Sequence, residues 1–155
     1  MSGNSNFSDD NTGPILELCY RDKTYPPPAI TIEGPVWESM ESAIRDVFGN
    51  GGFVRVSVIT PRASFIRQLS MKALPEKCTL VALTRATDPK SELLEWWESG
   101  DEPYRGNILF GDDEWDARMV CTKVEVILSL FKELFEHGDL HEGLLQMRSQ
   151  WDPKP

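Results

Sequence analysis

The clearest pattern in this chain is the alternation of apolar and polar residues between positions 53 and 84. Residues 53–60 alternate strictly, residues 64–74 alternate again, and residues 78–84 form a more apolar run. Loops of a few residues, at Pro61 and Pro75, separate the runs. Period-two alternation predicts strands, and such short loops predict antiparallel pairing in a meander. In residues 64–74 the pattern groups Phe65 with Leu69 and Met71, opposite Ile66, Gln68, Ser70 and Lys72.

Two segments instead repeat at helical spacing. The first opens at Gly34-Pro35, ends in the glycine run 49–52, and turns one apolar face inward: Trp37, Met40, Ile44, Val47 and Phe48. The second opens with a capping box, Thr122 to Glu125, and closes at Gly138. Its core-facing residues are Val124, Ile127, Leu128, Phe131, Leu134 and Phe135. A second cap signature at Asp139 predicts a shorter helix through Leu144, Leu145 and Met147.

Further strands are predicted at residues 15–20, 29–33, 107–110 and 114–121, the last with Trp115, Ala117, Met119 and Cys121 on one side. Residues 92–98 fit a strand or a helix equally well. Strands and helices without βαβ alternation indicate an α+β fold. We expect one domain, residues 14–151, with an antiparallel sheet of about six strands, two main helices on one face and a short C-terminal helix. Residues 1–13 are predicted to be disordered, and residues 152–155 form a tail anchored by Trp151.

Charge is concentrated in residues 92–116, which contain nine acidic residues and one basic residue, Arg105. The rest of the chain has 16 acidic and 15 basic residues, so the net charge of −9 is local. An acidic field mixed with aromatic residues predicts a surface for a basic partner. The predicted contacts are Trp96, Trp97, Glu98, Asp101, Glu102, Tyr104, Asp112, Asp113, Glu114, Trp115 and Asp116. Alternatively, the tryptophans belong to the core and their acidic neighbours face water.

Composition excludes several other classes of function. A pI near 4.7 argues against binding to nucleic acid or to anionic membranes. The sequence has no apolar run of the ~18 residues needed for a membrane span and no basic, apolar leader, so we expect a cytoplasmic protein. Three widely spaced cysteines, Cys19, Cys78 and Cys121, lack a C-x-x-C pair and are interpreted as buried, reduced thiols.

The candidates for catalysis and metal binding are few. His137 and His141 are four residues apart, but Gly138 is expected to break the helix and separate the rings. The cluster from Asp112 to Asp116 lacks the ligand spacing of an EF-hand. The glycine run at 49–52 follows a helix and has no lysine, unlike a phosphate-binding loop. We therefore expect a non-enzymatic protein without metal or cofactor; a metal-dependent enzyme using the Asp112–Asp116 cluster stays open as an alternative.

Several blocks of the sequence, between about Ile15 and Trp151, carry a family resemblance. A helix precedes GGFVRVSV, and QLSMKALPEKCTLVALTR, LLEWWESGDEPYRG and FGDDEWDARMVC follow. This layout resembles bacterial immunity proteins, the cytoplasmic antidotes of polymorphic or contact-dependent growth-inhibition toxins. The resemblance implies inhibition by binding a cognate toxin, here one with a basic surface. A structural or adaptor protein, or a homo-oligomer such as a homodimer using the same tryptophans, is the alternative.

Overall fold

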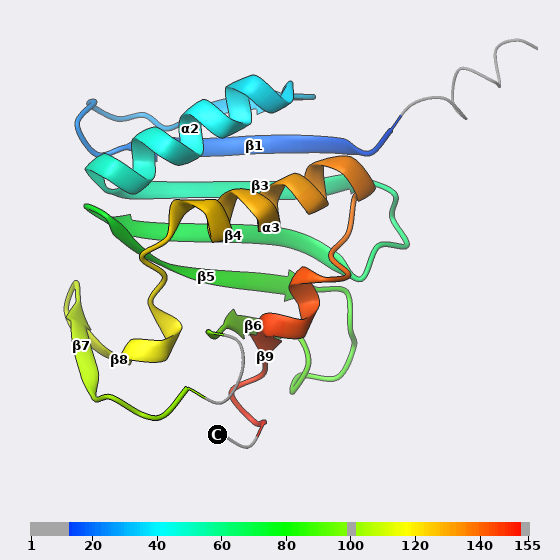
Figure 1. Ribbon diagram of the computed structural model, residues 1–155. Helices are drawn as coiled ribbons and strands as arrows, with labels where there is room; N and C mark the ends of the chain where they lie inside the picture. The colour runs from blue at the N-terminus through cyan, green and yellow to red at the C-terminus, as the bar shows by residue number, and fades with distance from the viewer. Residues whose placement is uncertain (1–12, 99–101, 153–155) are drawn as a thin grey trace, which may run out of the picture.

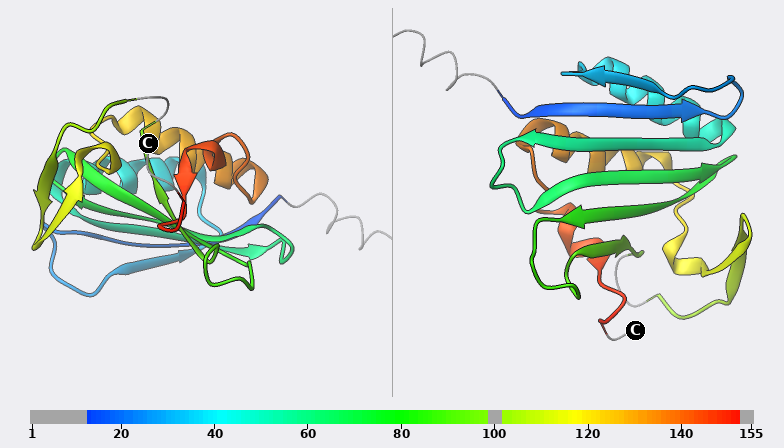
Figure 2. Two further views of the ribbon diagram at one scale, coloured as in Figure 1. Left: turned by 90° about the horizontal axis from the view of Figure 1, so that it is seen from below. Right: turned by 180° about the vertical axis from the view of Figure 1, so that it is seen from behind.

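The computed structural model describes residues 13–98 and 102–152. Its main feature is a seven-stranded antiparallel sheet in the order β2-β1-β3-β4-β5-β6-β9 (Figure 1). The strands are β1 (Ile15–Asp22), β2 (Ile30–Glu33), β3 (Gly52–Thr60), β4 (Ile66–Leu74), β5 (Lys77–Thr84), β6 (Leu93–Trp96) and β9 (Met147–Arg148). Helices α2 (Trp37–Asn50) and α3 (Val124–His137) both cover one face (Figure 2). The predicted α+β architecture is confirmed. The disorder predicted for residues 1–13 and the tail predicted at residues 152–155 lie outside the described residues, except for Gly13 and Asp152.

The core lies between this sheet and the two helices. One row of paired residues runs across five strands on the covered face, Leu18, Val56, Leu69, Ala82 and Leu94, and all five are buried. The helices contribute the predicted apolar faces, with these residues fully buried: Met40, Ile44 and Val47 from α2, and Ile127, Phe131 and Leu134 from α3. The hydrophobic period of each segment therefore matches the face that it buries.

Strand β4 differs from its predicted register at its first residues. Ile66 is fully buried with Leu69 and Met71, whereas Phe65 is 39% exposed. The pairing with β5 shifts between Ile66 and Gln68. A bulge adds one residue to a strand and so moves the preceding side chains to the other face. The assignment of Phe65 to the core face and of Ile66 to the opposite face was therefore wrong.

The two ends of α3 differ in how well the sequence predicted them. Gly138 adopts the left-handed conformation (φ 71°) and closes the helix as predicted. The predicted capping box was wrong, because the N-cap is Lys123 and its side chain forms no capping hydrogen bond.

The C-terminal segment is not the predicted short α-helix. The Asp139 carboxylate accepts hydrogen bonds from the backbone N–H groups of Phe65 (2.7 Å) and Ile66 (2.9 Å), so it ties α3 to the start of β4. Only a 3-10 turn, η2 (Gly143–Gln146), forms, and Met147 enters β9, the seventh strand. Trp151 is exposed and does not anchor the chain end by burial; Lys90 lies over its ring at 5.8 Å.

Residues 92–98, which fitted a strand or a helix equally well in the sequence, contain the strand β6. A second, two-stranded sheet follows, made of β7 (Asn107–Phe110) and β8 (Asp113–Asp116). The predicted strand at 114–121 ends at Asp116, because the Asp116 side chain accepts from the backbone N–H of Arg118 (3.0 Å) and caps a 3-10 turn, η1 (Ala117–Met119). Within residues 13–98 and 102–152, neither helix has the length and apolar character needed to cross a membrane.

Asp22, at the end of β1, gives the fold a testable dependence on pH. The buried carboxylate accepts hydrogen bonds from Thr24 N (2.9 Å), Thr24 Oγ1 (2.7 Å) and Asn50 Nδ2 (2.9 Å). Burial alone raises the pKa of Asp22, but these bonds outweigh burial and hold the pKa below its ordinary value of 3.8. The ionised carboxylate therefore contributes stability that is complete above about pH 4 and is lost as the pH falls through the folded pKa.

The substitution Asp22→Asn should lower the midpoint of urea unfolding at pH 7. The difference in midpoint between the variant and the unaltered protein should become smaller as the pH falls from 4 to 2. Urea titrations of both proteins across this range test the expectation. A constant difference between pH 4 and pH 2 would contradict the stabilising role of the ionised carboxylate.

Candidate functional site

The acidic segment identified in the sequence runs from β6 to β8. The β7–β8 hairpin lies apart from the main sheet, at the end where β5 begins (Figures 1 and 2). Asp101 lies outside the described residues. The other predicted contacts divide into buried, paired and exposed groups.

Trp96 and Trp97 form the buried group, each only 4% exposed. Trp96 belongs to the core cluster, and the backbone N–H of Trp97 donates to the carbonyl of Gln146 (2.8 Å). The guanidinium groups of Arg118 and Arg148 lie over the Trp97 ring, at 5.1 and 5.8 Å. The predicted role of both tryptophans as displayed contacts is therefore corrected, since neither ring belongs to the accessible surface.

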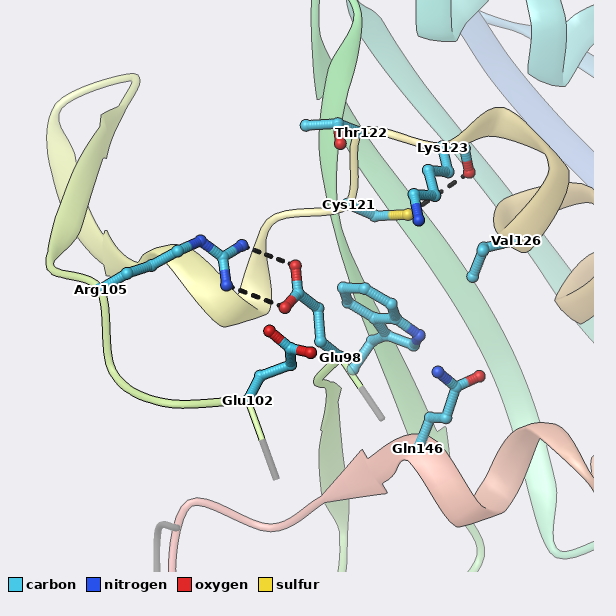
Figure 3. Close-up of a pocket in the computed structure, with 9 residues that line it drawn as sticks. Glu98, Glu102, Arg105, Cys121, Thr122, Lys123, Val126 and Gln146 are labelled. Carbon is cyan, nitrogen blue, oxygen red and sulfur yellow. Dashed lines mark hydrogen bonds and ion pairs between the residues drawn. The ribbon is translucent and has the colours of Figure 1, made fainter. Parts of the chain in front are cut away.

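Glu98 and Asp116 form the paired group. Arg105 donates two hydrogen bonds to Glu98, from Nη2 to Oε1 (2.6 Å) and from Nη1 to Oε2 (2.9 Å), which Figure 3 shows. Arg118 likewise donates from Nε (3.0 Å) and Nη2 (2.8 Å) to the carboxylate of Asp116. The bonds from Glu98 and Asp116 raise the pKa of Arg105 and Arg118 respectively. These two carboxylates are neutralised within the fold and are poorly placed to attract a partner.

The exposed group lies on and beside the hairpin. It comprises Glu102, Tyr104, Asp112, Asp113 and Glu114, and Leu109 joins it; we name these six residues the acidic hairpin surface. Tyr104 is 59% exposed and Leu109 is 64% exposed. None of the four carboxylates forms a salt bridge with any residue that the structure describes.

The hairpin orients this surface through its own register. Leu109 pairs with Glu114 on one face, and Ile108 pairs with Trp115 on the other. The second face packs inward: Phe110 is buried and meets the half-buried Trp115 edge to face at 6.4 Å. The outward face is extended by Tyr104, whose hydroxyl group lies 3.1 Å from Asn107 Oδ1 and donates to it. The packed aromatic face therefore leaves Leu109 and Glu114 on the outward face, while Asp113, which pairs with Phe110, is exposed at the turn.

A pocket of about 390 Å³ lies between the segment that precedes the hairpin, with Glu102 and Arg105, and the start of α3 (Figure 3). Its charged side chains are Glu98, Glu102, Arg105 and Lys123, two of each sign. Cys121 also lines it, paired through backbone hydrogen bonds with Cys78. The side-chain hydrogen bond with Cys121, together with burial, raises the pKa of the Cys78 thiol, so that thiol stays protonated near neutral pH. The pocket therefore holds two charges of each sign.

The structure also shows how the candidate metal ligands, His137 and His141, lie relative to each other. The helix does break at Gly138, but the rings of His137 and His141 remain neighbours, with centroids 6.1 Å apart. In the described part of the chain, no three or more His, Cys, Asp or Glu residues come together in a way that could hold a metal ion.

Two features of this region escaped the sequence analysis. The first is Arg118, which binds Asp116 and stacks on Trp97 and Tyr104; its position two residues after Asp116 in an acidic run was the available signal. The second is a groove on the bare face of the sheet, to which Trp115 contributes. Its basic residues alternate along separate strands, so they form a cluster only once the strand register is known.

The comparisons with known proteins concern the fold and the family. The fold is similar to the crystal structure of a hypothetical protein from Neisseria gonorrhoeae, with a TM-score of 0.59 and 11% sequence identity. The match covers 78% of this chain and 86% of that one, and at this identity it shows the fold alone. None of the curated proteins matches the sequence. The model of DUF6911, a family of unknown function, matches residues 19–144, so the chain belongs to the DUF6911 family.

Proposed function

We propose that this protein is a non-catalytic binding protein of the bacterial cytoplasm that neutralises a cognate protein toxin. It binds the toxin through the acidic hairpin surface, and the toxin presents a basic face. The proposal combines the resemblance of the sequence blocks to immunity proteins with the placement of charge in the fold. It requires no cofactor.

The observation that carries the proposal is the combination of charge and apolar exposure at the hairpin. Asp112, Asp113 and Glu114 have no salt-bridge partner within the described ranges. Leu109 lies directly across from Glu114 and is largely exposed. Like charges held close together oppose folding, so a concentration of this kind favours a role in recognition. Exposed carboxylates accelerate association with a basic partner, while Tyr and Leu side chains supply contact area.

The site is smaller than the sequence predicted. The proposed contacts with the toxin are the six residues of the acidic hairpin surface. Trp115 packs against Phe110 on the opposite face of the hairpin. Trp96, Trp97, Glu98 and Asp116 act indirectly, since their buried or paired side chains hold β6, η1 and the hairpin in place. The contact surface therefore depends on charge more than on aromatic anchors.

Affinity capture from the native bacterial lysate tests the proposal. The intact protein is the bait, capture is performed at low salt, and bound proteins are released at high salt and identified by mass spectrometry. We expect one basic protein to be released by salt, because exposed charges are screened beyond ~10 Å at 0.1 M ionic strength. The released protein should inhibit bacterial growth when expressed alone and should lose that effect when this chain is coexpressed.

A matched pair of variants localises the contact. Asp112→Asn/Asp113→Asn/Glu114→Gln removes three charges at the hairpin, whereas Glu38→Gln/Asp46→Asn/Glu136→Gln removes three exposed charges on the helices. Capture should fail with the first bait and persist with the second. If both baits capture equally, the hairpin assignment is wrong; if only copies of the bait are recovered, the homo-oligomer becomes the better account.

A further inference from the structure

The sheet face opposite the helices is bare (Figure 2) and carries a groove of about 630 Å³. Four basic residues line this groove, Arg21, Lys23, Arg55 and Lys72, together with the aromatic residues Phe53 and Trp115. The volume is in the range of small-molecule sites, ~300–1,000 Å³. The groove is separate from the exposed tip of the hairpin, because only Trp115 of that segment lines it.

Strand register groups the basic residues around Phe53. Phe53 of β3 pairs with Arg21 of β1 on one side and with Lys72 of β4 on the other. Neighbouring strands lie about 4.8 Å apart, so both basic residues flank the aromatic ring. Arg55 is two residues along β3 on the same face, with its guanidinium 5.4 Å from the centre of the Phe53 ring. Three positive charges therefore border one aromatic ring.

The charges in this groove are not balanced. No carboxylate is among its lining residues, and none of its four basic residues forms a salt bridge within residues 13–98 and 102–152. Besides its contact with the Phe53 ring, Arg55 donates a weak hydrogen bond from Nη2 to the sulfur of Cys19 at 3.7 Å. The Nε of Arg21 is shielded from solvent and has no hydrogen-bond partner among the described residues. The whole chain has 25 acidic and 16 basic residues, so this positive cluster runs against its overall charge.

We propose that the groove binds a small amphipathic anion, a flat apolar body carrying a carboxylate or a phosphate. Arg21, Arg55 and Lys72 hold the anionic group, since guanidinium and ammonium groups form the stronger, charge-assisted hydrogen bonds. Phe53 and Trp115 contact the flat body. The proposal goes beyond toxin binding and does not depend on it.

Quenching of tryptophan fluorescence by 4-nitrophenyl phosphate tests this site, because the nitrophenyl group absorbs the emission of a nearby indole. We expect saturable binding at one site that weakens with salt. Inorganic phosphate and uncharged 4-nitrobenzyl alcohol should each bind at least tenfold more weakly, because each lacks one half of the ligand. A parallel titration with 4-nitrobenzoate distinguishes a carboxylate ligand from a phosphate ligand. Trp115→Phe should reduce the quenching, because Trp115 is the indole that lines the groove.

Two double variants provide the decisive comparison. Arg55→Gln/Lys72→Gln should bind roughly 100-fold more weakly, because two charge-assisted contacts are lost at about tenfold each. Arg45→Gln/Arg62→Gln removes two exposed basic residues elsewhere and should bind like the unaltered protein. Urea denaturation confirms that both variants fold. Equal binding by the two variants, or binding of 4-nitrophenyl phosphate no tighter than that of inorganic phosphate, would overturn the assignment.

Discussion

Charge reversal at the hairpin tip, Asp112→Lys/Asp113→Lys/Glu114→Lys, is expected to weaken binding of the captured partner by at least about 100-fold, since like charges placed across an interface cost several kcal/mol. Most of the loss should appear in the association rate, because exposed charges steer the encounter. Surface plasmon resonance at two salt concentrations measures both effects. The rate for the unaltered protein should fall steeply with salt, and that of the variant should not.

The control for this experiment carries the same change in net charge at another site. Glu38→Lys/Asp46→Lys/Glu136→Lys places three lysines on α2 and α3, away from the hairpin. Its association should slow only modestly, through the overall charge. If the helix variant loses as much affinity as the hairpin variant, net charge rather than the acidic hairpin surface governs binding.

The substitution Gly52→Ala is expected to destabilise the protein by at least about 3 kcal/mol, combining backbone strain with steric overlap. Gly52 begins β3 with φ 127°, and an added Cβ would overlap the carbonyl oxygen of Arg21. The backbone of β1 or β3 would have to move, which disturbs the pairing of Asp22 with Gly52. The urea midpoint should fall by roughly 1–2 M for a slope typical of small domains.

The substitution Gly111→Ala is a control that separates the energetic cost of backbone strain from the cost of steric overlap. Gly111 also has a positive φ (67°), but no described residue other than its chain neighbours lies within 4 Å of an added Cβ. Gly111→Ala should lower the free energy of unfolding by only about 1–2 kcal/mol, which is the cost of placing a residue with a side chain in the left-handed conformation. Equal losses for the two variants would contradict the close approach of β1 to Gly52.

The sequence was most informative where a single period continued without interruption. The alternation of Val54, Val56 and Val58 predicted β3 and its buried face, and the spacing from Ile127 to Leu134 predicted α3. Predictions from the sequence were wrong where a local contact changed the spacing of the apolar residues. The bulge after Ile66 reversed one end of β4, and the carboxylate of Asp139 bonded to the backbone of β4 instead of starting a helix.

The candidate site was predicted only in part, for a related reason. Composition located the acidic charge in residues 92–116, but it did not distinguish the exposed carboxylates at 112–114 from those paired with Arg105 and Arg118. The burial of Trp96 depends on its position in the strand β6, and residues 92–98 fitted strand and helix equally well. The basic groove depends on the register of three strands, which no single segment of the sequence encodes.

Hydrogen–deuterium exchange of the protein with and without its captured partner tests the central claim most directly. The two states are compared at low salt, where the complex is most stable, and the peptides that cover residues 102–116 are followed. Binding through the acidic hairpin surface predicts slower exchange in this region and unchanged exchange along α2 and α3. Slower exchange on the helices, with no change at the hairpin, would contradict the proposed mode of binding.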